Sequence, residues 1–266
     1  MTPLKRALIE KAGHDHGFEH TVAATGAAVT LGSARHPAKA EVSWLPQGYG
    51  ITLVQGPGTL PPELARSFAD WPRAGDAYVA VSDAHLAQWF HRAAALAQSL
   101  PNQAAVDFDA QVQQTLAALP LADRLSTEVQ RVVRQRVGQD RYRQAMLDYW
   151  GGACAVTGLT LAPALRASHA KPWADCTTDA ERLDVFNGFL LSANLDALFD
   201  KFLISFTDEG ALLVSAELSV TERSLLGLDA PLTLRWVAPG HLPYLAFHRG
   251  YLRAATSRPS SITAIA

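Results

Sequence analysis

LRASHAKPW, at residues 165–173, contains the histidine on which the interpretation of this chain depends. His169 lies between small residues, and a Lys-Pro-Trp run ends the segment shortly afterwards. An imidazole at the end of a strand is either packed as an ordinary neutral side chain or poised as a base, because its pKa lies near neutrality. A lone histidine is more often structural, so the surrounding sequence has to decide between the two.

Composition limits the classes of protein that fit. The 266 residues predict one large or two modest domains, and 48% apolar with 18% charged residues is a globular composition. The formal net charge of −2 excludes bulk attraction to nucleic acid, so any such attraction must be local. No stretch approaches the roughly 20 apolar residues of a membrane span. The start, MTPLKRALIEKAGHDHG, predicts an amphipathic helix instead of a signal peptide.

The cysteines indicate the compartment. Cys154 and Cys176 are the only two, so they predict neither a disulfide framework nor a four-cysteine structural zinc site. Two lone thiols favour a reducing, cytoplasmic environment.

Residues 1–100 have the pattern of an α+β domain. Alternating apolar and small polar residues between 20 and 56 predict two to four antiparallel strands, and DAYVAVS at 76–82 predicts another. Ser82 can cap a long helix that stops before Pro101. Several large aromatic residues fall here, either as core or as a pocket for an extruded base. They are Trp44, Tyr49, Trp71, Tyr78 and Trp89.

A second long helix, expected over residues 126–149 and bent or broken near Gly138, is the one basic stretch. It is either a solvated helix face or an arm that contacts phosphates. Its arginines are Arg131, Arg134, Arg136, Arg141 and Arg143.

Three motifs follow in a fixed order. They are CAVTG at 154–158, SHAKPW at 168–173 and NGFLL at 187–191, which leads to LFD at 198–200. Together they resemble the HNH endonucleases, over about residues 130 to 218. The resemblance implies a β-hairpin packed on a helix that holds one divalent metal.

The resemblance also assigns roles to residues. His169 matches the general base that activates the attacking water, and Asn187 matches the asparagine that orients it. Asp196, nine positions later, matches the metal ligand on the helix.

Ser168 stands where many members have an acidic or histidine ligand, and we place it at the metal with Asp196, where its hydroxyl can hold a metal-bound water. Asp175 and Asp184 are alternatives, so the second metal ligand stays open. Asp200 either binds the metal, contacts a metal ligand without binding the metal, or is a surface residue at the helix end.

The implied cofactor is Mg²⁺ or Mn²⁺, because both favour oxygen ligands, with Ni²⁺ or Zn²⁺ as alternatives. The implied partner is double-stranded DNA, with a homodimer as the form that cuts both strands. The expected contacts with DNA phosphates are Arg131, Arg134, Arg136 and Lys171.

We therefore predict an α+β chain in three parts. Residues 1–100 form a target-recognition domain, residues 101–129 a helical linker, and residues 130–266 an HNH nuclease domain with a C-terminal extension. By analogy with restriction enzymes, the first domain directs the nuclease to modified DNA. The alternatives are a DNA-binding module without an effective metal site, and a toxin nuclease.

Overall fold

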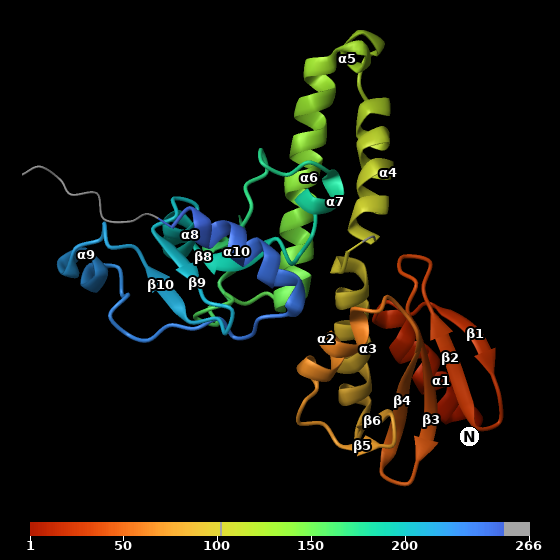
Figure 1. The fold of residues 1–266 in the computed structure, drawn as a ribbon. Coiled ribbons are helices and arrows are strands. Elements are labelled where there is room, and N and C mark those ends of the chain that lie inside the picture. The colour runs from red at the N-terminus through yellow and green to blue at the C-terminus, as the bar shows by residue number, and fades with distance from the viewer. Residues whose placement is uncertain (102, 253–266) are drawn as a thin grey trace, which may run out of the picture. The chain divides into compact units, whose positions relative to one another are not determined.

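The computed structural model describes residues 1–101 and 103–252, apart from the side chains of residues 103–107 and 122 (Figure 1). The chain divides into two compact units. The N-terminal unit comprises Met1–Gly151 with Leu183–Val185, and the C-terminal unit comprises Gly152–Arg182 and the chain from Phe186 onward. Both contain helices and strands, which confirms the predicted α+β class.

A six-stranded antiparallel sheet forms the centre of the N-terminal unit, in the order β1-β2-β3-β4-β6-β5. Alternation places Val29 and Leu31 of β2 in the core while Thr30 between them stays half-exposed. Four strands fall in the region where two to four were predicted. The six are β1 (His20–Ala24), β2 (Ala28–Gly32), β3 (Lys39–Leu45), β4 (Gly48–Gln55), β5 (Arg73–Ala74) and β6 (Ala77–Ala80).

A tight turn joins β3 to β4, where Leu45 pairs with Gly48. Gly48 has φ +139°, and a Cβ at this position would collide with the carbonyl oxygen of Ala80 on β6. Glycine is therefore required both by the backbone conformation and by the close approach of β6.

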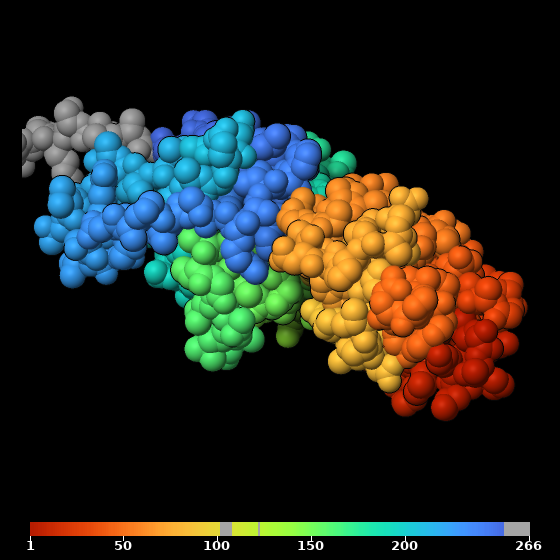
Figure 2. Space-filling view, turned by 90° about the horizontal axis from the view of Figure 1, so that it is seen from below, coloured from red at the N-terminus to blue at the C-terminus, as the bar shows by residue number. Residues whose placement is uncertain are grey.

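Three helices pack with this sheet: α1 (Pro3–Asp15), α2 (Leu60–Ser67) and α3 (Asp83–Ser99). As predicted, Ser82 caps α3, because its hydroxyl accepts the His85 N–H at 3.2 Å. Trp89 and Phe90 of α3 are fully buried, so Trp89 belongs to the core. The space-filling view shows α2 in orange beside α3 in yellow (Figure 2).

The helices that follow form an antiparallel pair within the N-terminal unit. They are α4 (Gln103–Ala117) and α6 (Thr127–Trp150), joined by α5 (Leu121–Leu125) (Figure 1). The residues predicted as a linker, 101–129, thus pack against residues 130–150, which were predicted to belong with the nuclease domain. None of the described helices combines the length and the apolar composition that crossing a bilayer requires.

The predicted break near Gly138 is wrong, because α6 continues through this residue without interruption. Gly138 is buried, so packing offsets the weak helix propensity of glycine. The helix ends at Gly151, which has φ +64°, a left-handed cap that glycine adopts without strain.

The C-terminal unit is built on a hairpin followed directly by a helix. Strands β7 (Leu165–His169) and β8 (Gly188–Ser192) pair antiparallel, and α8 (Ala193–Phe199) begins where β8 ends. Phe189 and Phe199 pack with Phe206 in a fully buried aromatic core. The other elements are η1 (Ala162–Ala164), α7 (Asp179–Arg182), β9 (Ile204–Phe206), β10 (Leu212–Val214), α9 (Val220–Leu225), η2 (Pro239–His241) and α10 (Leu242–Gly250).

The buried side chain of His248 joins α10 to this core by ring stacking and two hydrogen bonds. The ring of His248 stacks on Phe199, with centroids 3.8 Å apart. Its Nε2 donates to the Phe199 carbonyl at 3.1 Å, and Nδ1 accepts from the Ser205 hydroxyl at 3.0 Å. Burial lowers the pKa of His248 to about 4, against a small opposing effect of the Phe199 carbonyl.

Acid is expected to destabilise the fold through His248. An unfolded histidine has a pKa of about 6.5, so below that pH the unfolded chain binds a proton that the folded chain refuses until about pH 4. The stabilisation is therefore complete above pH 6.5 and is lost as the pH falls toward 4. Between pH 7 and pH 5 the contribution is about 2 kcal/mol.

Urea unfolding at both pH values measures this effect. His248→Gln keeps a donor toward the Phe199 carbonyl but cannot titrate, so its free energy of unfolding should fall less steeply with acid than that of the unchanged chain. Val22→Ala, at an exposed position of β1 without a titratable group, is the control and should leave the pH dependence unchanged. Equal slopes for all three chains would contradict the assignment.

Candidate active site

A hairpin and a helix position the candidate residues. In the hairpin, His169 pairs with Gly188 and Ser168 pairs with Phe189, so the first motif histidine ends its strand as predicted. The loop over 170–187 connects these strands, and α8 returns against β7. The strand–loop–strand–helix order is the frame that the sequence motifs implied.

The imidazole of His169 is held by a backbone carbonyl. Its Nε2 lies 2.8 Å from the Arg182 carbonyl oxygen and donates to it, and its ring packs edge-to-face on Trp173 at 5.9 Å. In this tautomer Nδ1 carries the lone pair that accepts a proton. Burial lowers the pKa of His169 to about 4, partly opposed by the Arg182 carbonyl, so the ring is neutral at pH 7.

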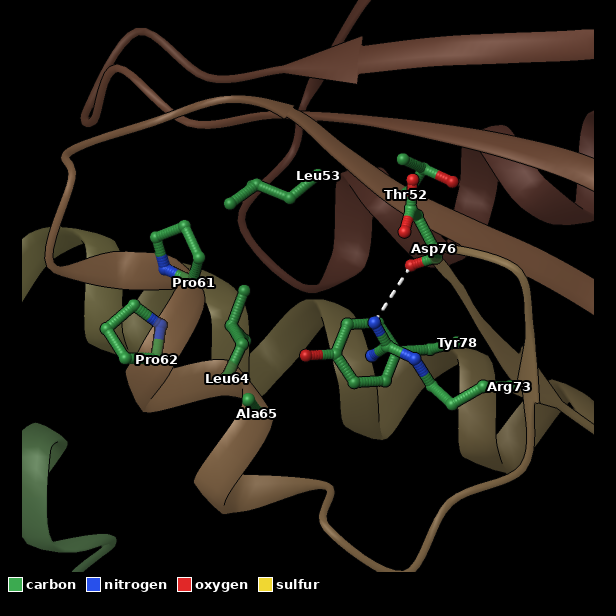
Figure 3. Close-up of a pocket in the computed structure, with 9 residues that line it drawn as sticks. All are labelled: Thr52, Leu53, Pro61, Pro62, Leu64, Ala65, Arg73, Asp76 and Tyr78. Atoms are coloured by element: carbon green, nitrogen blue, oxygen red, sulfur yellow. Dashed lines mark hydrogen bonds between the residues drawn. The ribbon is translucent and has the colours of Figure 1, made fainter.

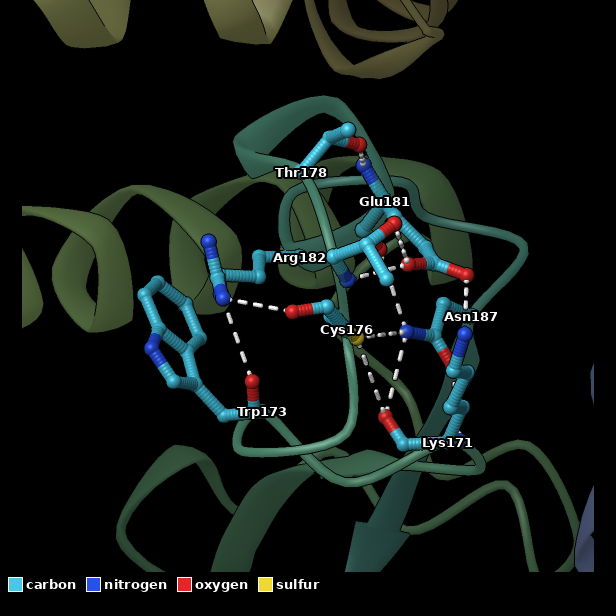
Figure 4. Close-up of polar contacts among 8 residues, drawn as sticks. Lys171, Trp173, Cys176, Thr178, Glu181, Arg182 and Asn187 are labelled. Atoms are coloured by element: carbon cyan, nitrogen blue, oxygen red, sulfur yellow. Dashed lines mark hydrogen bonds and ion pairs between the residues drawn. The ribbon is translucent and has the colours of Figure 1, made fainter.

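The side chain of Arg182 keeps that carbonyl in place. Its guanidinium donates to the carbonyls of Trp173 at 3.3 Å and Cys176 at 2.5 Å (Figure 4). It also pairs with Asp179 at 3.0 Å. These contacts bind separate parts of the loop to one planar group. The position of the histidine partner is thus fixed by the loop that connects the two strands.

Asn187 closes the same loop. It is fully buried; its Oδ1 accepts the Lys171 N–H at 2.8 Å, and its Nδ2 donates to the Lys171 carbonyl at 3.2 Å. Nδ2 also reaches the Glu181 carbonyl at 3.0 Å and the Cys176 sulfur at 3.4 Å (Figure 4). The predicted orientation of His169 by Asn187 therefore has an indirect route, through the residue before Arg182.

The two predicted metal residues come together although 28 positions separate them. The hydroxyl of Ser168 donates to Asp196 Oδ1 at 2.5 Å, and Ser168 is 1% exposed. Asp200 follows Asp196 by one helical turn. Partial burial of the Asp200 carboxyl and the charge of Asp196 raise its pKa, with Lys201 opposing.

A hard divalent cation fits this donor set. A hydroxyl and two carboxylates supply oxygen ligands, and a cation would stabilise the negative form of Asp200, which burial and then the charge of Asp196 disfavour. In the described part of the chain, no cluster joins three or more histidine, cysteine or acidic side chains. Any such ion would therefore need water or phosphate oxygens to complete its shell.

A cleft of about 280 Å³ borders the His169 ring. Asp200 lines this cleft and is also the exposed residue that caps α8, so its position is compatible both with a ligand and with a surface residue at the helix end. Residues that the sequence analysis did not single out complete the cleft: Lys201, Phe202 and His248. Lys201 and Phe202 could have been found from the sequence, because they directly follow the LFD motif. His248 could not, because it lies too far along the chain for any of the motifs to include it.

Phe202 holds an unusual conformation in this cleft. Its φ is +55°, and its N–H donates to Phe199 while Leu203 N–H donates to Leu198, both at 2.9 Å. These bonds form a Schellman cap, whose left-handed position normally belongs to glycine. A phenylalanine here costs on the order of 1 kcal/mol, and its ring packs on His248 at 4.8 Å.

The predicted phosphate contacts have different surroundings. Lys171 pairs with Glu181 at 2.5 Å, and its side chain is 19% exposed. Arg134 pairs with Asp109 at 2.8 Å within the N-terminal unit. Arg131 and Arg136 are exposed on α6. Arg134 and Lys171 would thus have to exchange a carboxylate for a phosphate, whereas Arg131 and Arg136 face solvent.

The N-terminal unit has a pocket of about 400 Å³ (Figure 3). The pocket opens beside the part of β4 that extends beyond its pairing with β6. The last residues paired between these strands are Ile51 and Tyr78. Arg73 lies over the Tyr78 ring at 3.8 Å and donates to the Asp76 carbonyl at 3.0 Å. The opposite wall is apolar and comes from β4 and α2: Leu53, Pro61, Pro62, Leu64 and Ala65.

Comparison with known families agrees with the geometry of the C-terminal unit. The HNH_2 model, which describes HNH endonucleases, matches residues 154–207. This range contains both strands of the hairpin, the loop and α8. No curated protein matches the chain. Residues 154–207 of this chain therefore match an HNH endonuclease domain, which supports nuclease activity in general.

Proposed function

We propose that the C-terminal unit hydrolyses phosphodiester bonds in double-stranded DNA with His169 as general base. The observation that carries this proposal is the neutral imidazole held through Nε2 by the Arg182 carbonyl, with the adjacent residue Ser168 hydrogen-bonded to Asp196 of α8. Nδ1 takes a proton from the water that attacks phosphorus in line. The negative phosphate raises the low pKa of His169 when DNA binds, which strengthens it as a base.

Asp196 and Ser168 would hold Mg²⁺ or Mn²⁺, with Asp200 as an additional carboxylate. When bound, the cation supplies charge stabilisation at the scissile phosphate and at the leaving oxygen. Asn187 and Arg182 keep the loop closed, so the base needs no rearrangement before reaction. Both cysteines are free and buried, which supports a reducing cytoplasmic setting.

Replacing His169 tests the base. His169→Ala should lower the cleavage rate by about a hundredfold or more, because it removes the proton acceptor, while DNA affinity stays within about twofold. Plasmid cleavage with Mg²⁺, Mn²⁺ or EDTA, with binding measured by anisotropy, checks both. His20→Ala is the control. Loss of binding together with cleavage would identify His169 as structural, and cleavage that survives in EDTA would exclude the metal.

Replacing Asn187 tests the indirect route to the base. Asn187→Asp keeps the acceptor for the Lys171 N–H but removes the donors to the Glu181 and Lys171 carbonyls. The turnover number should fall at least tenfold while KM for DNA changes little, because binding groups stay in place. Exchange of the Arg182 and Glu181 amides should quicken in the same variant. An unchanged turnover number would show that His169 does not depend on this loop.

For the N-terminal unit we propose target recognition through the pocket of Figure 3. A guanidinium stacked on a tyrosine, facing an apolar wall, suits a planar heterocycle with a polar edge. A modified base extruded from DNA has that chemistry. Of the five aromatic residues considered from sequence, Tyr78 is the one that lines this pocket. Together the units make a restriction-type enzyme; its pairing into a homodimer stays a prediction.

Variants of this pocket should change selection and not catalysis. Arg73→Ala removes the stacked cation, so the preference for cytosine-modified over unmodified plasmid should fall by about tenfold. Cleavage of unmodified DNA should be unaffected. Arg35→Ala, an exposed arginine outside the pocket, serves as the control. If Arg73→Ala keeps the full preference, recognition lies elsewhere; if the unchanged enzyme shows no preference, the modification proposal fails.

The rival function is a DNA-binding module on the same scaffold. Ser168 in place of an acidic ligand favours it, because a hydroxyl binds a dication weakly. The position of Asp200 favours the enzyme, because it places a second carboxylate one helical turn after Asp196 and in the cleft that borders His169. Nothing among the described residues favours the toxin alternative over these two.

A further inference from the structure

Three aromatic rings form a continuous surface beside the His169 cleft, the aromatic shelf of Phe202, Phe247 and Tyr251. Phe202 and Tyr251 have ring centroids 5.4 Å apart, and Phe247 and Tyr251 are 5.0 Å apart. Tyr251 is 57% exposed, and the other two rings are half-exposed. The aromatic core of the same unit, in contrast, is fully buried.

The shelf is continuous with the reacting group. Phe202 belongs both to the shelf and to the wall of the cleft that contains His169. Lys201, exposed and next in sequence, lines that cleft as well. A phosphate at the histidine would thus have a cation at one side, and the sugar and base attached to it would meet the rings.

The conformation of Phe202 indicates that its ring is kept for a purpose other than the backbone turn. Glycine would make the same cap without strain, whereas phenylalanine adopts φ +55° at a cost. The ring that results covers His248 on one side and remains partly open on the other.

We propose that the aromatic shelf stacks a base of the DNA strand being cut, next to the scissile phosphate. This inference rests on the proposed nuclease function and extends it to the state of the substrate. Every base has a flat face that an aromatic ring can stack on, so the contact carries no sequence preference. Lys201 holds the adjoining phosphate in the cleft.

The proposal restricts the substrate. In an intact duplex both faces of a base are covered by its neighbours, so a base reaches the shelf only after leaving the stack. A strand that is already unpaired at the cut avoids that cost. The enzyme should therefore prefer DNA with an unpaired stretch at the cleavage point over a perfect duplex.

Phe202→Gly and Tyr251→Ala remove the rings in different ways. The glycine relieves the backbone strain at 202, so loss of function there cannot be ascribed to an unfavourable turn. Leu225→Ala is the control, because this side chain is 83% exposed in the same unit and away from the shelf. Thermal unfolding of each full-length variant confirms that it folds.

One oligonucleotide sequence, prepared as a single strand, a perfect duplex and a duplex with a central unpaired stretch, provides the test. Binding is measured in a His169→Ala background and cleavage with Mg²⁺. We expect each shelf variant to bind the unpaired substrates about 5- to 100-fold more weakly and to lose the preference over perfect duplex. Leu225→Ala should match the unchanged enzyme.

The outcomes separate the two proposals. Failure of the unchanged enzyme to cut any substrate in a His169-dependent way overturns the proposed nuclease function. If cutting depends on His169 but the shelf variants bind and cut all three substrates as the unchanged enzyme does, only the shelf inference is overturned. Shelf variants that change the oligomeric state and not DNA affinity also overturn it, because the rings would then contact a second copy.

Discussion

The buried amide of Asn187 is the contact on which the candidate site depends. This one side chain joins separate parts of the loop over 170–187. Its Oδ1 accepts from the Lys171 N–H, and its Nδ2 donates to the carbonyls of Lys171 and Glu181. An amide has two donors and two acceptor lone pairs, so a single buried residue can serve both directions. Arg182 lies directly after Glu181, and its carbonyl then meets the ring of His169.

Burial is the main cause of the pKa shifts in both parts of this site. It keeps the imidazole of His169 neutral, and together with the charge of Asp196 it raises the pKa of Asp200. A neutral base and a crowded pair of carboxylates make opposite demands: the first accepts a proton, and the second is stabilised by a cation. In the proposed function, side chains of one hairpin and one helix would serve both the base and the cation.

Spacing within motifs carried information that single residues did not. Ser168 and Asp196 meet because the hairpin register and the short connection to α8 fix the geometry between them, and the motif order encodes both. The carbonyl of Arg182 could not be predicted, since any residue supplies one. The position of His248 in the wall of the cleft could not be predicted either, because it depends on how the distant helix α10 packs. In the N-terminal unit, α4 and α6 read as a linker and an arm because their packing against each other leaves no local signature.

The distribution of ion pairs changes what the basic residues can contribute to DNA binding. Arg134, Lys171 and Arg182 each pair with a carboxylate inside their own unit, so a phosphate has to displace that partner before it gains anything. The net attraction from such residues is therefore smaller than their number implies, and it weakens with salt. Uncharged contacts gain relative weight as a result. Base stacking on exposed rings is such a contact, because it needs no partner to be released. A chain with net charge −2 that contains a nuclease domain is consistent with binding in which charge aligns the backbone and stacking supplies much of the affinity.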